Sequence, residues 1–312
     1  MKYDFDSYLL YEVTSSSLYT AKAVVELNIP VHGEVLREAA QKAFRRFPYY
    51  SRTVRRDEQG AFVLEPCEGP ICVFEEGEQV TLGTEQTNGL LFAITYGPST
   101  VYFNFCHNFC GGCGAMMWIK STLWQFLTDE GYEVDSEGIL TPGSPIPPEE
   151  TAVPDPESFP EEEVIGRYTG GDSYVPIKDY LPYLTNPSKG GQVFYPIAYR
   201  EKIDEIHGKT LKTAYALKNS PLRNGVKDTF NVSYVGNVDW GGLAAYIEEI
   251  YSLTEGHLML EVNSAREKFC IAFQVLNRDE NFIREFVKVL EEEGISYELG
   301  EMVESRLPQI TI

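Results

Sequence analysis

The sequence predicts an α/β protein of two lobes, each a mixed β-sheet covered by helices. Strand-like and helix-like segments alternate in both halves, and an acidic, proline-rich stretch separates these halves. The length of 312 residues suits two domains at roughly 100–200 residues each. We therefore expect an N-terminal subdomain over residues 1–140, a linker or surface crossover over 141–163, and a shortened C-terminal subdomain over 164–312.

The elements of the first half follow from hydrophobic periodicity. Residues 18–31 alternate as a strand does, and residues 33–46 place apolar side chains on one helical face. That helix must end before Pro48, because the residue before a proline disfavours helical backbone. Further strands are expected at 53–55, 61–65, 71–74, 91–96 and 101–107. A second helix is expected over 115–128, after a glycine-rich turn.

The second half begins with the segment 141–163, which holds seven prolines and seven acids and no basic residue. Such a segment buries too little apolar surface to form core. Residues 164–225 show no clear period, apart from a possible helix near 201–207. Beyond them, strands are expected at 230–235, 257–263, 268–276 and 296–299, and helices at 242–253 and 279–293.

Composition and charge exclude several function classes. Hydrophobic residues make up 43% of the chain, which excludes disorder of the whole. The formal charge of -21 repels phosphate backbones and anionic lipid, so we expect no nucleic-acid and no membrane partner. The first residues lack the basic start and apolar run of a signal peptide, and no run of 18 apolar residues occurs. A cytoplasmic location is expected.

A cysteine–histidine segment at 106–114 is the most informative stretch of the chain. Cys106, Cys110 and Cys113 have the spacing C-x3-C-x2-C that can hold an iron–sulfur cluster or another metal, with His107 as a further ligand. A Cys–His nucleophilic pair is a second interpretation, although adjacent residues of a strand point to opposite faces. In the third, a strand ends in a histidine and a glycine turn leads into a helix.

The third interpretation carries a family resemblance. The run from His107 to Ala115 is similar to the motif H-x-x-x-D-G-x-G-A of the chloramphenicol-acetyltransferase-like CoA-dependent acyltransferases. Residues 24–50, 221–224 and 230–237 resemble, in the same order, other segments of the alcohol-acetyltransferase and condensation-domain branch. The resemblance implies two chloramphenicol-acetyltransferase-like α/β sandwich subdomains, the second one shortened.

The resemblance also implies a reaction and its residues. His107 would be the general base, which removes a proton from an alcohol or amine acceptor. Ser233 would stabilise the oxyanion of an acyl thioester, with Asn231 and Gly112 contributing to substrate binding. The expected partners are a small-molecule acceptor and acetyl-CoA or another acyl thioester as substrate. No tightly bound cofactor is expected.

Departures from the motif keep two alternatives open. Gly111 stands where the motif has an aspartate that pairs with an arginine, and Cys106 replaces the first histidine of the stricter motif. The second half is also short. A catalytically inactive binding or scaffold descendant of the fold is therefore the first alternative, and a protein with metal on Cys106, Cys110 and Cys113 is the second.

Overall fold

A computed structural model describes most of the first half of the chain and part of the second. It covers residues 20–56, 58, 62–107, 109–151, 174–176, 194–196, 231–234, 238–254, 259–275, 280–303 and 307–311. In these ranges, no helix combines the length and the apolar character needed to cross a bilayer.

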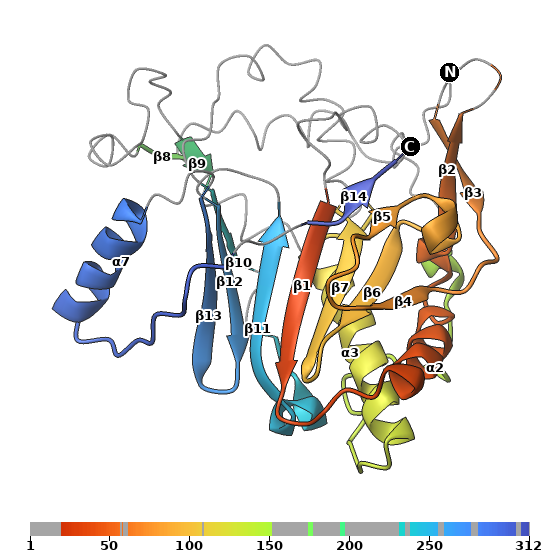
Figure 1. The fold of residues 1–312 in the computed structure, drawn as a ribbon, viewed down its shortest axis with the longest axis horizontal. Coiled ribbons are helices and arrows are strands. Elements are labelled where there is room, and N and C mark those ends of the chain that lie inside the picture. The colour runs from red at the N-terminus through yellow and green to blue at the C-terminus, as the bar shows by residue number, and fades with distance from the viewer. Residues whose placement is uncertain are drawn as a thin grey trace.

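Five strands form the larger sheet, in the order β11-β1-β7-β6-β4 (Figure 1). Their bounds are β1 Thr20–Leu27, β4 Cys72–Glu75, β6 Phe92–Tyr96, β7 Thr100–Cys106 and β11 Ile247–Thr254. β1 pairs antiparallel with both β7 and β11, whereas β4 pairs parallel with β6. The sheet is therefore mixed, as expected.

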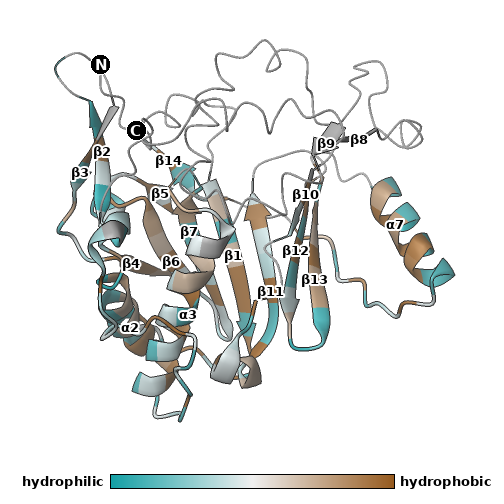
Figure 2. Ribbon diagram, turned by 180° about the vertical axis from the view of Figure 1, so that it is seen from behind, coloured by the Kyte–Doolittle hydropathy of each residue, from teal (hydrophilic) through white to brown (hydrophobic). Residues whose placement is uncertain are grey.

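Two helices cover one face of this sheet (Figure 2). They are α2 Gly33–Phe44 and α3 Gly112–Asp129. Every second residue of β1 is buried, as the alternation of side chains across a strand requires. Phe103 of β7 lies opposite Ala23 of β1. Its ring contacts the fully buried Trp118 of α3, with ring centroids 5.0 Å apart. Trp118 also contacts Phe44 of α2, so one aromatic cluster joins both helices to the sheet.

A second sheet has the strand order β10-β12-β13. Its strands are β10 Asn231–Tyr234, β12 Met259–Ala265 and β13 Lys268–Gln274. β12 and β13 form an antiparallel hairpin, and β10 pairs parallel with β12. The three strands expected at 230–235, 257–263 and 268–276 are confirmed, with shifted ends.

The helix expected over 242–253 is wrong. A short 3-10 helix, η10 Gly241–Ala245, is followed by β11, which pairs with β1 along almost its whole length. The buried residues Leu243, Ile247 and Ile250 have a spacing that also fits a helical face. The open edge of β1 provides backbone partners for residues 247–254, and this long-range pairing decides the conformation.

Side-chain hydrogen bonds join β11 to β12 and so connect the two sheets. The Ser252 hydroxyl donates to the Asn263 side-chain oxygen at 3.2 Å. The Thr254 hydroxyl donates to the Glu261 carboxylate at 2.7 Å. Glu261 and Asn263 are both buried, so the junction of the sheets is polar.

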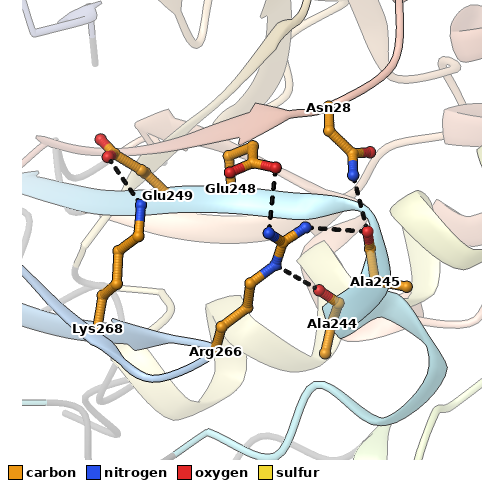
Figure 3. Close-up of polar contacts among 7 residues, drawn as sticks. All are labelled: Asn28, Ala244, Ala245, Glu248, Glu249, Arg266 and Lys268. Carbon is orange, nitrogen blue, oxygen red and sulfur yellow. Dashed lines mark hydrogen bonds and ion pairs between the residues drawn. The ribbon is translucent and has the colours of Figure 1, made fainter.

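Arg266, at the tip of the β12–β13 hairpin, binds the hairpin to η10 and β11 (Figure 3). Its guanidinium donates to the carbonyl oxygens of Ala244 at 3.1 Å and Ala245 at 3.0 Å, and it pairs with Glu248 at 3.1 Å. Asn28, just after β1, donates to the same Ala245 oxygen. One short turn therefore ties the first sheet to the hairpin of the second.

The remaining elements are short or peripheral. In the ranges that the structure describes, the 3-10 helices besides η10 are η1 Pro48–Tyr50, η2 Glu85–Thr87 and η3 Pro148–Glu150. Three two-stranded sheets pair β2 Arg52–Arg56 with β3 Phe62–Pro66, β5 Thr81–Leu82 with β14 Gln309–Ile310, and β8 Tyr174–Pro176 with β9 Phe194–Pro196. The pairing of β5 with β14 brings the end of the chain to its first half, which the sequence did not predict.

Helix α7, Asn281–Glu292, confirms the helix expected over 279–293 and lies beyond β13 at the outer end of the molecule (Figure 1). Its Phe286 ring contacts Phe273 of β13 at 4.9 Å, and none of its residues is buried. The strand expected at 296–299 is wrong. Those residues are exposed and lie outside any strand.

The start of the expected linker packs on the first half. Glu150 in η3 pairs with the buried guanidinium of Arg46, and Arg52 donates to the Thr151 carbonyl oxygen at 3.2 Å. Residues 152–163, and nearly all of the aperiodic stretch 164–225, lie outside the described ranges. The subdomain boundaries at 140 and 163 stay a prediction.

Candidate functional site

His107 follows the last residue of β7, the central strand that β1 and β6 flank. The side chain is exposed, and its ring stacks on Phe105 with centroids 6.4 Å apart and planes 22° apart. Desolvation by the surrounding protein lowers the pKa of the imidazole from its ordinary value of 6.5. The ring is therefore mainly neutral at pH 7 and can accept a proton.

Two buried residues, Phe109 and Cys110, lie between His107 and α3. Phe109 donates its backbone N–H to the Cys106 carbonyl oxygen at 3.1 Å, and both Phe109 and Cys110 are buried. Gly111 is the N-cap of α3, in extended conformation and with no side-chain cap. The helix begins at Gly112 rather than at residue 115, so the glycines form its first turn instead of a separate turn before it.

Two of the three clustered cysteines contact other parts of the protein. Cys106 ends β7 opposite Thr20 of β1, and the Cys110 thiol donates a hydrogen bond to the Tyr50 hydroxyl at 3.2 Å. In the part of the chain that the structure describes, no group of three or more histidine, cysteine or acidic residues could hold a metal ion. The side chain of Cys113 lies outside that part, so the three-cysteine site stays a prediction.

Ser233 lies in β10, half-buried and directly opposite Glu261 of β12. Paired residues of a ladder point to the same face, so Ser233 shares a face with Glu261, which accepts the hydrogen bond from Thr254. Thr254 pairs with Ala21 on the α3-covered face of the larger sheet. The side chain of Asn231 lies outside the described residues, and Gly112 is the half-buried first residue of α3.

The strand directions place His107 and Ser233 at the same end of the strands. We call this end of the two sheets, where β7 and β11 finish and β10 and β12 begin, their edge. β7 and β11 run parallel to each other, since both pair antiparallel with β1, so His107 and Thr254 lie at one edge. Thr254 bonds Glu261, which lies opposite Ser233 near the start of β10 and β12. His107 shares the face of Phe105, which lies opposite Ala21, and Thr254 pairs with the same Ala21, so His107 and Thr254 lie on one face of the larger sheet.

The path from β7 to β10 runs through β1, β11 and β12, with three backbone-paired steps and the side-chain junction between β11 and β12. At about 4.8 Å a step, that path is on the order of 20 Å. The intervening edge is polar: Thr254 and Glu261 are hydrogen-bonded, and Asn263 keeps a buried side-chain N–H with no partner. Sequence reasoning missed these three residues. Glu261 and Asn263 alternate with apolar residues within an expected strand, and that inward polar pattern could have revealed them.

An open hollow lies elsewhere, between the β2–β3 hairpin and η2. It is lined by Arg55, Cys67, Thr84 and Asn88, among others, and contains neither His107 nor Ser233. This hollow is therefore separate from the candidate site.

Comparison with known proteins identifies the fold. No family model and no curated protein matches the sequence. Among solved structures, the first condensation domain of the calcium-dependent antibiotic synthetase, in complex with substrate analogue 2a, superposes with a TM-score of 0.55 over 93% of this chain and 94% of that chain, at 11% identity. The chain has the condensation-domain fold. A second structure of that synthetase's first condensation domain gives a TM-score of 0.54 at 12% identity over the same shares.

The condensation-domain fold confirms the predicted fold class and the resemblance on which it was based. A structure of TRI101 from F. sporotrichioides, complexed with coenzyme A and T-2, is also similar, at 12% identity over 85% of this chain and 92% of that chain. Its TM-score is 0.39. At these identities the likeness establishes fold alone, and the roles of His107, Ser233, Asn231 and Gly112 remain predictions.

Proposed function

We propose that this protein transfers an acyl group from a thioester, of coenzyme A or of a carrier, to an alcohol or amine. The observation that supports the proposal is the imidazole of His107. It is exposed at the end of the central strand of a condensation-domain fold, and its pKa is lowered so that it is neutral at pH 7. A neutral, accessible imidazole is the form that a general base requires.

The reaction follows from that base. His107 accepts the proton of the acceptor hydroxyl or amine while the acceptor oxygen or nitrogen bonds to the thioester carbonyl carbon. The carbon–sulfur bond then breaks, and the imidazolium returns its proton to the leaving thiolate. The products are an ester or amide and a free thiol.

Ser233 is proposed to donate a hydrogen bond to the carbonyl oxygen as that oxygen becomes negative. It lies opposite Glu261, whose hydrogen-bond partner Thr254 shares a face of the larger sheet with His107. The role requires the two sheets to curve toward each other there, because the path along the strands is on the order of 20 Å. Asn231 and Gly112 are proposed to contact the substrate on either side of this edge.

Thiol release tests the proposal. Purified protein is incubated with acetyl-CoA, longer acyl-CoA esters or an acylated carrier, together with a panel of alcohols and amines, and free thiol is measured. We expect His107→Ala to lower the rate by about 10²–10⁴-fold. The matched control is His32→Gln, since His32 is paired with Glu130 at 2.9 Å and precedes α2. Equal rates in wild type and His107→Ala would remove His107 from the mechanism.

A binding or scaffold protein without catalysis is the second candidate. Gly111 supports it, because α3 begins with no side-chain cap where the resembled motif has an acid. This candidate predicts no thiol release with any donor but saturable binding of an acyl thioester or of the acceptor, measured by calorimetry. Turnover that depends on His107 would reject it.

A further inference from the structure

A stack of aromatic rings supports the imidazole of His107. Successive ring centroids lie 5.7, 4.6, 6.4 and 6.4 Å apart, with planes within 22° of each other. The rings, in order, are those of Phe47, Tyr50, Phe92, Phe105 and His107. Offset-stacked pairs at such distances are each worth about 0.5–1.5 kcal/mol. The orientation of the exposed imidazole is therefore connected, ring by ring, to the buried interior.

The polar end of Tyr50 contacts the loop that follows His107. Its hydroxyl accepts a hydrogen bond from the Cys110 thiol at 3.2 Å, and both side chains are buried. Burial, together with the Cys110 thiol, raises the pKa of Tyr50 well above 10, so the hydroxyl keeps its proton. Tyr50 and Cys110 are 60 residues apart, so this bond fixes the loop to a different part of the chain.

Gly114 provides the space for this contact. A Cβ at position 114 would lie 2.6 Å from the Tyr50 hydroxyl oxygen and 3.2 Å from the Cys110 sulfur. Only glycine in the first turn of α3 lets the phenol approach Cys110 so closely.

From these contacts we propose that Tyr50 and Cys110 are positioning residues for His107, and that they hold the loop in the absence of an acid at Gly111. Tyr50 acts through two contacts. Its ring supports the imidazole through the stacked rings of Phe92 and Phe105, and its hydroxyl accepts the hydrogen bond from Cys110. The catalytic consequence rests on the proposed function, whereas the effect on the orientation of the imidazole does not.

Three variants test the hydrogen bond while the stacked Tyr50 ring stays in place. Tyr50→Phe keeps the stacked ring and loses the hydrogen bond, Cys110→Ala loses the same bond and leaves the ring, and Cys110→Ser keeps a donor. Tyr49→Phe is the control, because Tyr49 contacts the edge of the Tyr50 ring at 6.1 Å and its loss of a hydroxyl leaves the Tyr50–Cys110 pair in place. Far-UV circular dichroism and the melting temperature establish that each variant folds.

The readout is the NMR titration of the His107 imidazole, assigned by its loss in His107→Gln among only four histidines. We expect Tyr50→Phe and Cys110→Ala to move the titration midpoint up toward 6.5, as a released loop becomes better solvated, and Cys110→Ser and Tyr49→Phe to leave it unchanged. An unchanged midpoint in folded Tyr50→Phe and Cys110→Ala would overturn the proposal.

Thiol release gives the second readout. We expect the two variants that lose the bond to lower kcat roughly tenfold with KM unchanged, because a displaced base loses reactive geometry. If the wild-type protein releases no thiol, the proposed function fails. The NMR titration still decides whether Tyr50 and Cys110 position the ring.

Discussion

Substitution of Gly114 by alanine tests how tightly the His107 loop is packed. In an unhindered helix this change stabilises by up to about 1 kcal/mol, because glycine is a poor helix former. Here the new Cβ would lie 2.6 Å from the Tyr50 hydroxyl oxygen, and Tyr50 is stacked between Phe47 and Phe92. Overpacking of this kind costs about 1–3 kcal/mol, so we expect Gly114→Ala to lower the free energy of unfolding by about 1–2 kcal/mol.

A double-mutant cycle isolates the cause of that loss. Tyr50→Phe removes the nearest atom and should itself cost about 1 kcal/mol for the lost hydrogen bond. In the Tyr50→Phe background the Gly114→Ala change should be neutral or slightly stabilising, which gives a coupling energy of about 1–2 kcal/mol. Urea denaturation followed by circular dichroism measures the free energy of unfolding of all four proteins.

Gly143→Ala is the matched control for the loss of a glycine. A Cβ there would meet nothing closer than the Thr141 hydroxyl oxygen at 4.0 Å, and the backbone does not need glycine. We expect no loss, or a small gain from the stiffer unfolded chain. If Gly114→Ala is as stable as the wild type, or has the same effect with and without the Tyr50 hydroxyl, the close packing inferred at this loop is wrong.

Three further predictions concern other contacts. Arg266→Ala should lower the free energy of unfolding by about 1–3 kcal/mol and speed amide hydrogen exchange in β12 and β13. Arg266→Gly should lower it less, because the φ of 53° at this position favours glycine, and equal losses in the two variants would contradict this. Glu150→Ala should cost about 1–3 kcal/mol in urea denaturation, because it removes the carboxylate that pairs with the buried Arg46, while the 38% exposure of Glu150 screens part of the interaction; an unchanged free energy of unfolding would contradict this. Because the pKa of His107 is lowered in the folded protein, the unfolded chain binds the imidazole proton more readily, and the free energy of unfolding should fall as the pH drops through 6.5. His107→Gln should make the free energy of unfolding depend less on pH, and an unchanged dependence would refute the prediction.

The sequence predicted the elements whose signals are local. The apolar period of 33–46 and the position of Pro48 predicted α2, and alternation predicted β1, β6, β7 and the strands of the β12–β13 hairpin. The motif from His107 to Ala115 predicted a histidine at a strand end before a helix, which the structure confirms. Each of these features depends on residues that are close together in the sequence.

Contacts between distant residues decided the rest. Residues 247–254 carry a spacing that also suits a helix, and only the open edge of β1, more than 200 residues away, makes them a strand. The bond between Tyr50 and Cys110 likewise joins two segments, 60 residues apart, that no local pattern connects. Local propensity limits the conformations a segment can adopt, but backbone pairing and burial in the folded chain select among them.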